Sequence, residues 1–180
     1  MASTTMLKRL PTRSELENIC HRAMKAVAQE AVTIIIRRTA QGLDADGNEF
    51  APYSTDYGNK KAMAGRQADR VDLTVTGDLL NKLKLLRVED VARVIIGWGP
   101  AQHRSYEFVK GAKGRGKNRG AYGPGAYQLK ITKKTVSIAD IVEGLSAKRD
   151  FFAIRSPDEI ARLVAIFDRH VADGLATFTR

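Results

Sequence analysis

The sequence has few of the residues that catalysis and covalent cross-linking require. Its 180 residues include one cysteine, Cys20, and three widely spaced histidines, His21, His103 and His170. A single thiol excludes an intrachain disulfide and a thiolate zinc site, and the histidines lack the spacing of a metal site. Motifs of the G-x-S-x-G and H-E-x-x-H type are absent. We therefore predict a protein that is not an enzyme, with no catalytic residues, metal, cofactor or small-molecule substrate.

Long hydrophobic runs are also missing. The longest aliphatic run, residues 32–36, is broken by Thr33 and followed by Arg37 and Arg38. It is far shorter than the roughly 20 apolar residues of a membrane span. Residues 1–10 contain basic residues without an apolar stretch behind them, which predicts no secretion signal. We expect a protein that has no membrane partner and is located in the cytoplasm where it is made.

Positive charge, in contrast, is abundant and concentrated. The chain has 30 Lys and Arg against 20 Asp and Glu, a net charge of +10. Residues 104–134 hold nine basic residues and one acid, Glu107, so this segment carries +8 and the rest only +2. Because residues 111–125 are also rich in glycine, we predict a basic inserted loop over 104–134. Its candidate contacts to a partner or to DNA phosphates are Arg104, Lys110, Lys113, Arg115, Lys117, Arg119, Lys130, Lys133 and Lys134.

The basic loop is compatible with two kinds of partner. Its Lys and Arg residues, interspersed with Tyr106, Tyr122 and Tyr127, could follow a phosphate backbone and stack on bases. They could equally contact an acidic protein surface. Residues 111–117 also match the P-loop pattern G-x-x-x-x-G-K, but Asn118 stands where that motif needs Ser or Thr, and no helix is predicted after it. We therefore interpret the segment as a basic loop and not as a nucleotide site.

The N-terminal part of the chain predicts one long helix. Ser14 and Glu17 have the spacing of a capping box, and apolar residues follow at three- and four-residue steps on one helical face, which predicts a helix over 14–40. Residues 44–50 predict a turn, with Gly47 at a position of positive φ. They do not form a calcium loop, because neither end position of an EF-hand pattern would supply a carboxylate.

The middle of the chain predicts short strands. Residues 52–70 are polar with little periodicity and predict an extended surface segment with one short helix. Two β-like stretches on either side of an acidic pair predict a hairpin over 83–98. Residues 128–131 and 135–138 predict another short β pair. These strands would form a small antiparallel sheet that carries the long basic, glycine-rich insertion.

The C-terminal part predicts a second amphipathic helix. Ser156 and Glu159 form a capping box with Pro157 at the first helical position, and apolar residues continue the pattern to about residue 175. Acidic residues around this start are explained by capping and the helix dipole. The sequence therefore predicts a single α+β domain over residues 1–180, with helices over 14–40 and 156–175 on either side of the small sheet.

Four stretches of the sequence form an ordered series. Residues 37–54 contain the pattern G-x-D-x-x-G-x-x-F-x-P-Y-S, residues 72–80 read D-L-T-V-T-G-D-L-L, residues 94–97 read V-I-I-G, and residues 149–159 read R-D-F-F-A-I-R-S-P-D-E. Together they resemble the phage virion-morphogenesis family, the tail-completion or head–tail joining proteins of long-tailed bacteriophages and prophages. Two features depart from the family pattern: Asp150 replaces its usual proline, and the basic stretch over 110–134 is longer than expected.

The resemblance implies a structural α+β subunit without catalytic residues. It implies a homo-oligomeric ring in the neck or at the head-proximal end of the tail, located in the virion and assembled in the cytoplasm of the bacterial host. The implied partners are further copies of the chain and phage connector and tail proteins. We expect the contacts to come from the 83–98 hairpin and the 104–134 loop, with DNA as a further partner if the loop faces the ring lumen.

An alternative function follows from the charge alone. A stand-alone module could use the 104–134 loop to bind nucleic acid without sequence preference, and its binding would weaken steeply with salt.

Overall fold

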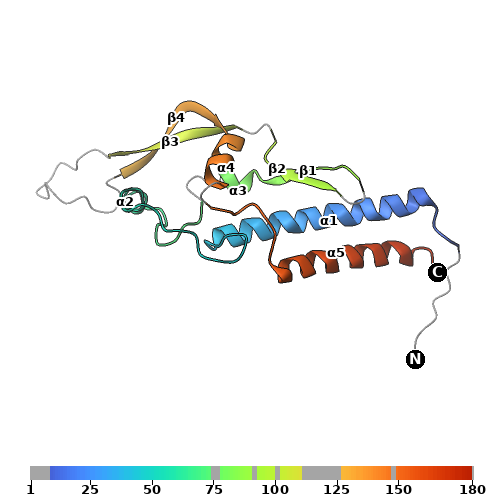
Figure 1. The fold of residues 1–180 in the computed structure, drawn as a ribbon. Helices are drawn as coiled ribbons and strands as arrows, with labels where there is room; N and C mark the ends of the chain where they lie inside the picture. The colour runs from blue at the N-terminus through green and yellow to red at the C-terminus, as the bar shows by residue number, and fades with distance from the viewer. Residues whose placement is uncertain are drawn as a thin grey trace, which may run out of the picture. The chain divides into compact units, whose positions relative to one another are not determined.

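A computed structural model describes residues 9–73, 78–90, 93–99, 102–110, 127–146 and 149–179. It confirms the α+β class, with a long N-terminal helix, short antiparallel strands and a C-terminal helix. No helix within these ranges is long and apolar enough to cross a membrane. The elements in chain order (Figure 1) are α1 (Arg13–Ala40), α2 (Thr55–Met63), α3 (Asp78–Asn81), β1 (Lys84–Val88), β2 (Val94–Gly97), β3 (Gln102–Lys110), β4 (Tyr127–Ser137), α4 (Ile138–Ser146) and α5 (Pro157–Ala176).

The chain forms two compact units, each assembled from separate stretches of sequence. Unit 1 comprises Met1–Arg37, Leu83–Gly99 and Ala153–Arg180, and so contains most of α1, the β1–β2 hairpin and α5. Unit 2 comprises Arg38–Lys82 and Pro100–Phe152, with α2, α3, β3, β4 and α4. The boundary falls inside α1. The single domain expected from the sequence stays a prediction.

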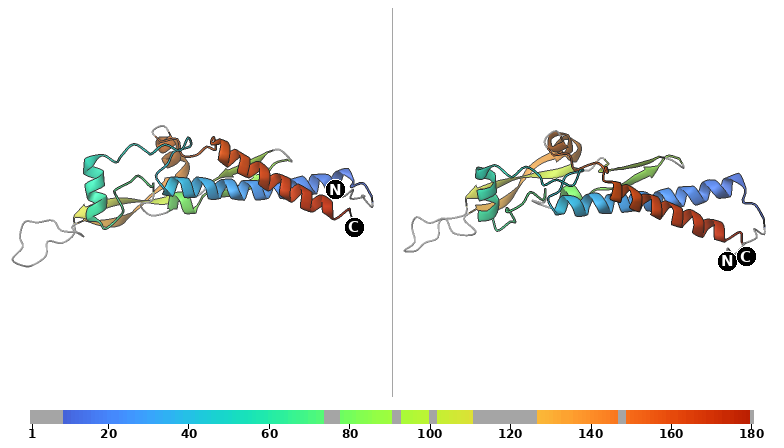
Figure 2. Two further views of the ribbon diagram at one scale, coloured as in Figure 1. Left: turned by 90° about the horizontal axis from the view of Figure 1, so that it is seen from below. Right: turned by 60° about the horizontal axis from the view of Figure 1, so that its bottom comes forward.

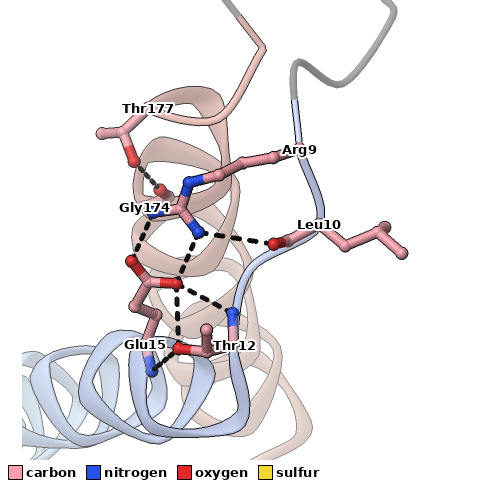
Figure 3. A network of polar contacts seen from close by, with 6 residues as sticks. All are labelled: Arg9, Leu10, Thr12, Glu15, Gly174 and Thr177. Carbon is pink, nitrogen blue, oxygen red and sulfur yellow. Dashed lines mark hydrogen bonds and ion pairs between the residues drawn. The ribbon is translucent and has the colours of Figure 1, made fainter.

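Helix α1 begins one residue earlier than predicted, and a different pair of residues caps it. The backbone N–H of Glu15 donates to Thr12 Oγ1 at 3.3 Å, and the N–H of Thr12 donates to Glu15 Oε2 at 2.8 Å (Figure 3). This reciprocal pair is a capping box, so the predicted box at Ser14 and Glu17 is wrong. Glu17 instead forms an i, i+4 ion pair with Arg13 at 2.8 Å.

Helix α1 is buried on two sides, not on the one face that its apolar spacing predicted. Ala23 and Ala28 are both completely buried, although residues five apart point about 140° away from each other on a helix of 3.6 residues per turn. Leu16, one of the regularly spaced apolar residues near the start of the helix, is 41% exposed. Figures 1 and 2 show the reason within unit 1: α1 lies between the hairpin and α5.

Helix α5 runs antiparallel to α1. Gly174 lies against Ile19, and Arg162 Nη2 forms a 2.7 Å ion pair with Glu30 Oε1, so residue numbers rise on one helix as they fall on the other. As predicted, Ser156 is the N-cap and Pro157 lies in the first turn. However, Ser156 makes no side-chain capping hydrogen bond, so this part of the second capping-box prediction is wrong.

The predicted hairpin over 83–98 is confirmed. Strands β1 and β2 pair antiparallel from Lys84 opposite Gly97 to Val88 opposite Val94, with a register shift between Leu85 and Arg87. Glu89 at the turn forms ion pairs with Arg87 and Arg93. These pairs neutralise part of the positive charge beside the turn.

Unit 2 contains a second two-stranded sheet where the sequence predicted a loop. Strands β3 and β4 pair antiparallel, with Lys110 opposite Tyr127 and Gln102 opposite Ser137. The prediction of a loop over 104–134 is therefore corrected at residues 104–110 and 127–134. The predicted β pair of residues 128–131 and 135–138 is also wrong, since 128–137 are in one strand and Ile138 begins α4.

The predicted turn at residues 44–50 is confirmed and joins α1 to the rest of unit 2. Asp44 Oδ1 accepts hydrogen bonds from the backbone N–H groups of Asp46 and Asn48, and Gly47 has φ of 85°. Desolvation raises the pKa of Asp44, but these backbone hydrogen bonds outweigh it and leave the pKa below its ordinary value. The N–H of Ala45 donates to the carbonyl of Asp150 at 2.7 Å, and this hydrogen bond holds the turn against the segment before α5.

Candidate functional site

Strands β3 and β4, which we call the basic arm, contain five of the nine basic residues predicted as contacts. Arg104 and Lys110 are on β3, and Lys130, Lys133 and Lys134 are on β4. Against them the two strands contain one acid, Glu107. The other four predicted residues lie outside the described residues: Lys113, Arg115, Lys117 and Arg119.

The cross-strand register pairs the one acid of the arm with one of its lysines. Glu107 lies directly opposite Lys130, and both are exposed. Opposite charges at directly facing positions of an antiparallel pair attract each other. The sequence of the two strands contains four further basic residues, Arg104, Lys110, Lys133 and Lys134, and no further acid.

The adjacent lysines of β4 lie where the ladder is interrupted. The register shifts between Arg104, which pairs with Thr135, and Tyr106, which pairs with Ile131. Residues 132–134 of β4 therefore lie opposite the single Ser105 of β3, and Lys133 and Lys134 are among these extra residues. Such bulges bend a strand locally. The register thus places two consecutive lysines at one irregular point of the arm, whose two strands contain five basic residues against one acid.

Unit 2 also contains a buried polar cluster that the sequence analysis missed. Lys61, in the last turn of α2, is completely buried, and its Nζ lies 2.8 Å from Asp72 Oδ1 and 3.0 Å from Tyr53 Oη. Tyr53 Oη in turn lies 3.3 Å from Asp72 Oδ1. The ammonium group is also 4.6 Å from the centroid of the Tyr53 ring, a cation–π distance.

The geometry of this cluster favours a structural role. A buried lysine charge is tolerated only with a close counter-ion and further hydrogen bonds, and Asp72 and Tyr53 supply both. A fully buried ammonium that is paired in this way cannot reach a substrate. The cluster ties the segment before α2, the end of α2 and the loop around Asp72 to one another. Leu73, the next residue, has φ of 51°, which is unusual for a residue other than glycine.

The sequence contains a weak signal that Lys61 faces the inner side of α2. Tyr57 and Lys61 are four residues apart and therefore share a face of α2, and Tyr53 lies 5.0 Å from Tyr57 between ring centroids. Lys60 is on another side of the same helix and forms an i, i+4 ion pair with Asp56 at 2.5 Å. The prediction of a surface segment over residues 52–70 therefore did not distinguish buried Lys61 from Lys60.

Polar contacts fix the start of α1, and Arg9 also lies against the residues that follow α5 (Figure 3 shows the polar contacts). Arg9 makes two hydrogen bonds to the carboxylate of Glu15, at 2.9 and 2.5 Å, and its guanidinium lies 4.8 Å from the centroid of the Phe178 ring. The hydrogen bond from Arg9, with those from Thr12, lowers the pKa of Glu15 to about 2. The start of α1 in unit 1 is therefore stabilised by polar contacts at the surface.

The outward side of α5 is apolar and exposed. Ile160 and Val164 are 47% and 52% exposed, and α5 has no buried residue among those described. Leu86 on β1 is exposed in a similar way. Large exposed apolar side chains that occur together are typical of interaction sites, and α5 has such a pair in Ile160 and Val164.

Neither a metal centre nor a known relative accounts for these features. In the described ranges no group of three or more His, Cys, Asp and Glu side chains could hold a metal ion. Comparisons with protein-family models, curated proteins and solved structures found no match to this chain. The surfaces above are therefore interpreted from their own chemistry and from the sequence motifs.

Proposed function

We propose that this protein is a structural subunit of a bacteriophage virion that acts in head–tail joining or tail completion. In this role it works through contacts and not through catalysis, as one member of a homo-oligomeric ring in the neck region. Its partners are further copies of the chain and phage connector and tail proteins. Its location is the virion, after assembly in the bacterial cytoplasm.

The observation that carries the proposal is that three of the four motif stretches contact one another in unit 2. Arg38 of the first stretch donates to the carbonyl of Phe151 in the last at 3.0 Å. The Ala45 N–H donates to the Asp150 carbonyl, and Tyr53 contacts Asp72 of the second stretch. Motifs that lie far apart in sequence but depend on one another in the fold support a shared origin better than isolated matches would.

The backbone geometry explains why one position of the first motif stretch is a glycine. Gly42 has φ of 83°, and a Cβ built there would lie 2.9 Å from the carbonyl oxygen of Val71. Only glycine satisfies both the positive φ and the close approach of the backbone. The pattern on which the resemblance rests is therefore tied to the packing of this chain.

The direct test is to locate the protein in particles. A phage or prophage that encodes this chain would be grown with a peptide tag on it, and gold-labelled antibody would be imaged by electron microscopy. The proposal predicts label at the head–tail junction of complete particles. Label on the capsid shell, or particles that contain no tagged chain, would contradict it.

A second candidate function is favoured by the charge of the basic arm. A stand-alone module that binds nucleic acid without sequence preference predicts DNA binding by the monomer. The affinity would fall with salt by a log–log slope of about 0.9 per phosphate contacted. Replacing both Lys133 and Lys134 by Gln should then reduce the slope by about 2. Ring formation without a DNA shift at physiological salt would exclude this candidate.

A further inference from the structure

Helix α5 has apolar side chains on two sides but a neighbour within unit 1 on only one of them. Its inner side contacts α1 at Ile19 and Glu30. On the outer side Ile160 and Val164 remain about half exposed, and Asp168 continues the same ridge four residues further on. A helix that is apolar on both sides is normally covered on both. Within the described residues of unit 1, the outer ridge of α5 therefore stays about half exposed.

The hairpin presents a second exposed apolar side chain, Leu86, beside basic residues. Leu86 is 41% exposed and lies beside Gly97 and Gly99, where a Cβ would be 3.4 and 3.5 Å from its methyl groups. Because these glycines have no side chains, the methyl groups of Leu86 lie over them and form the apolar surface of this part of the hairpin. Lys84, also exposed, precedes it by two residues.

The two surfaces are complementary in charge. Residues 157–176 of α5 contain four acids and two arginines, a net charge of −2 in a chain of +10, and one of those arginines, Arg162, is paired with Glu30. Residues 84–97 contain three basic and two acidic residues, a net charge of +1. An acidic apolar ridge and a basic apolar hairpin attract each other and set their mutual orientation.

The spacing along the two surfaces is similar. Val164 and Asp168 are about 6 Å apart along a helix that rises 1.5 Å per residue. Leu86 and Lys84 are two residues apart on β1, which is about 7 Å or less, because the register shift of the hairpin falls at Leu86. An apolar contact between Val164 and Leu86 therefore brings Asp168 within reach of Lys84.

The two surfaces belong to opposite outer layers of unit 1, with α1 between them (Figures 1 and 2). One copy therefore cannot bring its own two surfaces together, whereas successive copies can. We propose that α5 of one copy docks on the β1–β2 hairpin of the next, with Ile160 and Val164 against Leu86 and Asp168 facing Lys84. Such a contact is heterologous and closes into a ring if the rotation allows; the closed ring, though not the contact, rests on the proposed function.

The test blocks each surface in turn and then mixes the variants. Val164→Glu and Leu86→Glu each place a charge at the centre of the contact, and each should weaken self-association at least about 30-fold. Native mass spectrometry should show oligomers for the wild type and monomers for each variant. A mixture of the two variants should give dimers and nothing larger, because each pair retains one intact α5 and one intact hairpin.

Gln29→Glu, a charge added to an exposed position of α1, is the control and should assemble as the wild type does. Circular dichroism checks that all variants remain folded. If the wild type forms rings and Leu86→Glu does so too, the docking proposal fails while the proposed ring survives. A wild type that stays monomeric at all concentrations would overturn both the contact and the ring. A mixture that stays monomeric would also overturn the docking proposal.

Discussion

Unit 1 and unit 2 are each stabilised by a different kind of internal contact. In unit 2, polar groups are buried and paired: Lys61 with Asp72 and Tyr53, and Arg38 with the carbonyl of Phe151. In unit 1, the polar contacts of the helix ends lie at the surface, as with Arg9 and Glu15. Unit 1 buries apolar side chains such as Ile19 and Ile35, but leaves Ile160 and Val164 on α5 about half exposed.

The difference concerns which contacts are already satisfied within the chain and which would gain stability from a partner. Burying a charge is costly unless its partners are held in place, so a cluster such as that of Lys61 requires a well-defined surrounding structure. An exposed pair such as Ile160 and Val164 has no such requirement and gains stability only when something covers it. We therefore expect the buried cluster around Lys61 to be held in place without a partner, whereas the exposed ridge of α5 is where we propose that another copy binds.

The largest effect is expected from removing the buried charge of unit 2. Lys61→Met leaves Asp72 buried without its counter-ion, which should reduce the free energy of unfolding by about 3–5 kcal/mol. The neighbouring Lys60→Met removes only an exposed pair and should change it by about 0.3–0.5 kcal/mol. Denaturant unfolding of both variants measures the difference, and equal effects would refute the central role of the buried pair.

Two glycines give opposite predictions in the two units. At Gly174 a Cβ would lie 2.7 Å from Ile19 Cγ2, whereas at Gly58 in α2 the nearest atom is Tyr53 Cβ at 3.8 Å. Alanine favours a helix over glycine by about 1 kcal/mol, and overpacking costs about 1–3 kcal/mol. Gly58→Ala should therefore raise the melting temperature and Gly174→Ala should lower it. A Gly174→Ala variant that is stabilised would show that α1 and α5 are not closely packed there.

Thr12→Ala removes the capping hydrogen bond at the start of α1. It should reduce the free energy of unfolding by about 1 kcal/mol, within a range of about 0.5–2 kcal/mol. Ser14→Ala, at the position that sequence spacing favoured, should change the stability by less than about 0.5 kcal/mol. Thermal unfolding of the two variants decides between the two caps. A larger loss for Ser14→Ala would restore the original assignment.

The smallest effect concerns pH. The pKa of Glu15 is lowered from 4.5 to about 2 in the folded chain, so the folded state favours the ionised carboxylate. Its contribution to stability is complete above pH 4.5 and is lost as the pH falls toward 2. Glu15→Gln should remove this part of the acid dependence. NMR titration of the Glu15 carboxyl checks the pKa, and a midpoint near 4.5 would contradict the pairing with Arg9.

Elements with a local signal could be predicted from the sequence. The two long helices and the hairpin around Glu89 were correct because apolar periodicity and turn residues act within a few positions. The cap of α1 was wrong because Thr12–Glu15 and Ser14–Glu17 have the same spacing, and only the fold selects one. The virion role of the protein stays a proposal.

Features that depend on long-range pairing could not be predicted. The strands of the basic arm were interpreted as part of a loop because their charge and the glycines beside them outweighed their β-branched residues. Lys61 was read as exposed because nothing near it in sequence reveals that Asp72 comes within 2.8 Å. The outer ridge of α5 could not be seen either, because spacing shows that Ile160 and Val164 are apolar but not that they stay uncovered.

The most direct test of the contrast between the units is hydrogen–deuterium exchange of the wild-type protein at low and at high concentration. The account predicts that protection rises with concentration in residues 157–176 and 84–97, while residues 53–72 are equally protected at both. A rise confined to residues 53–72, or no change anywhere, would contradict it.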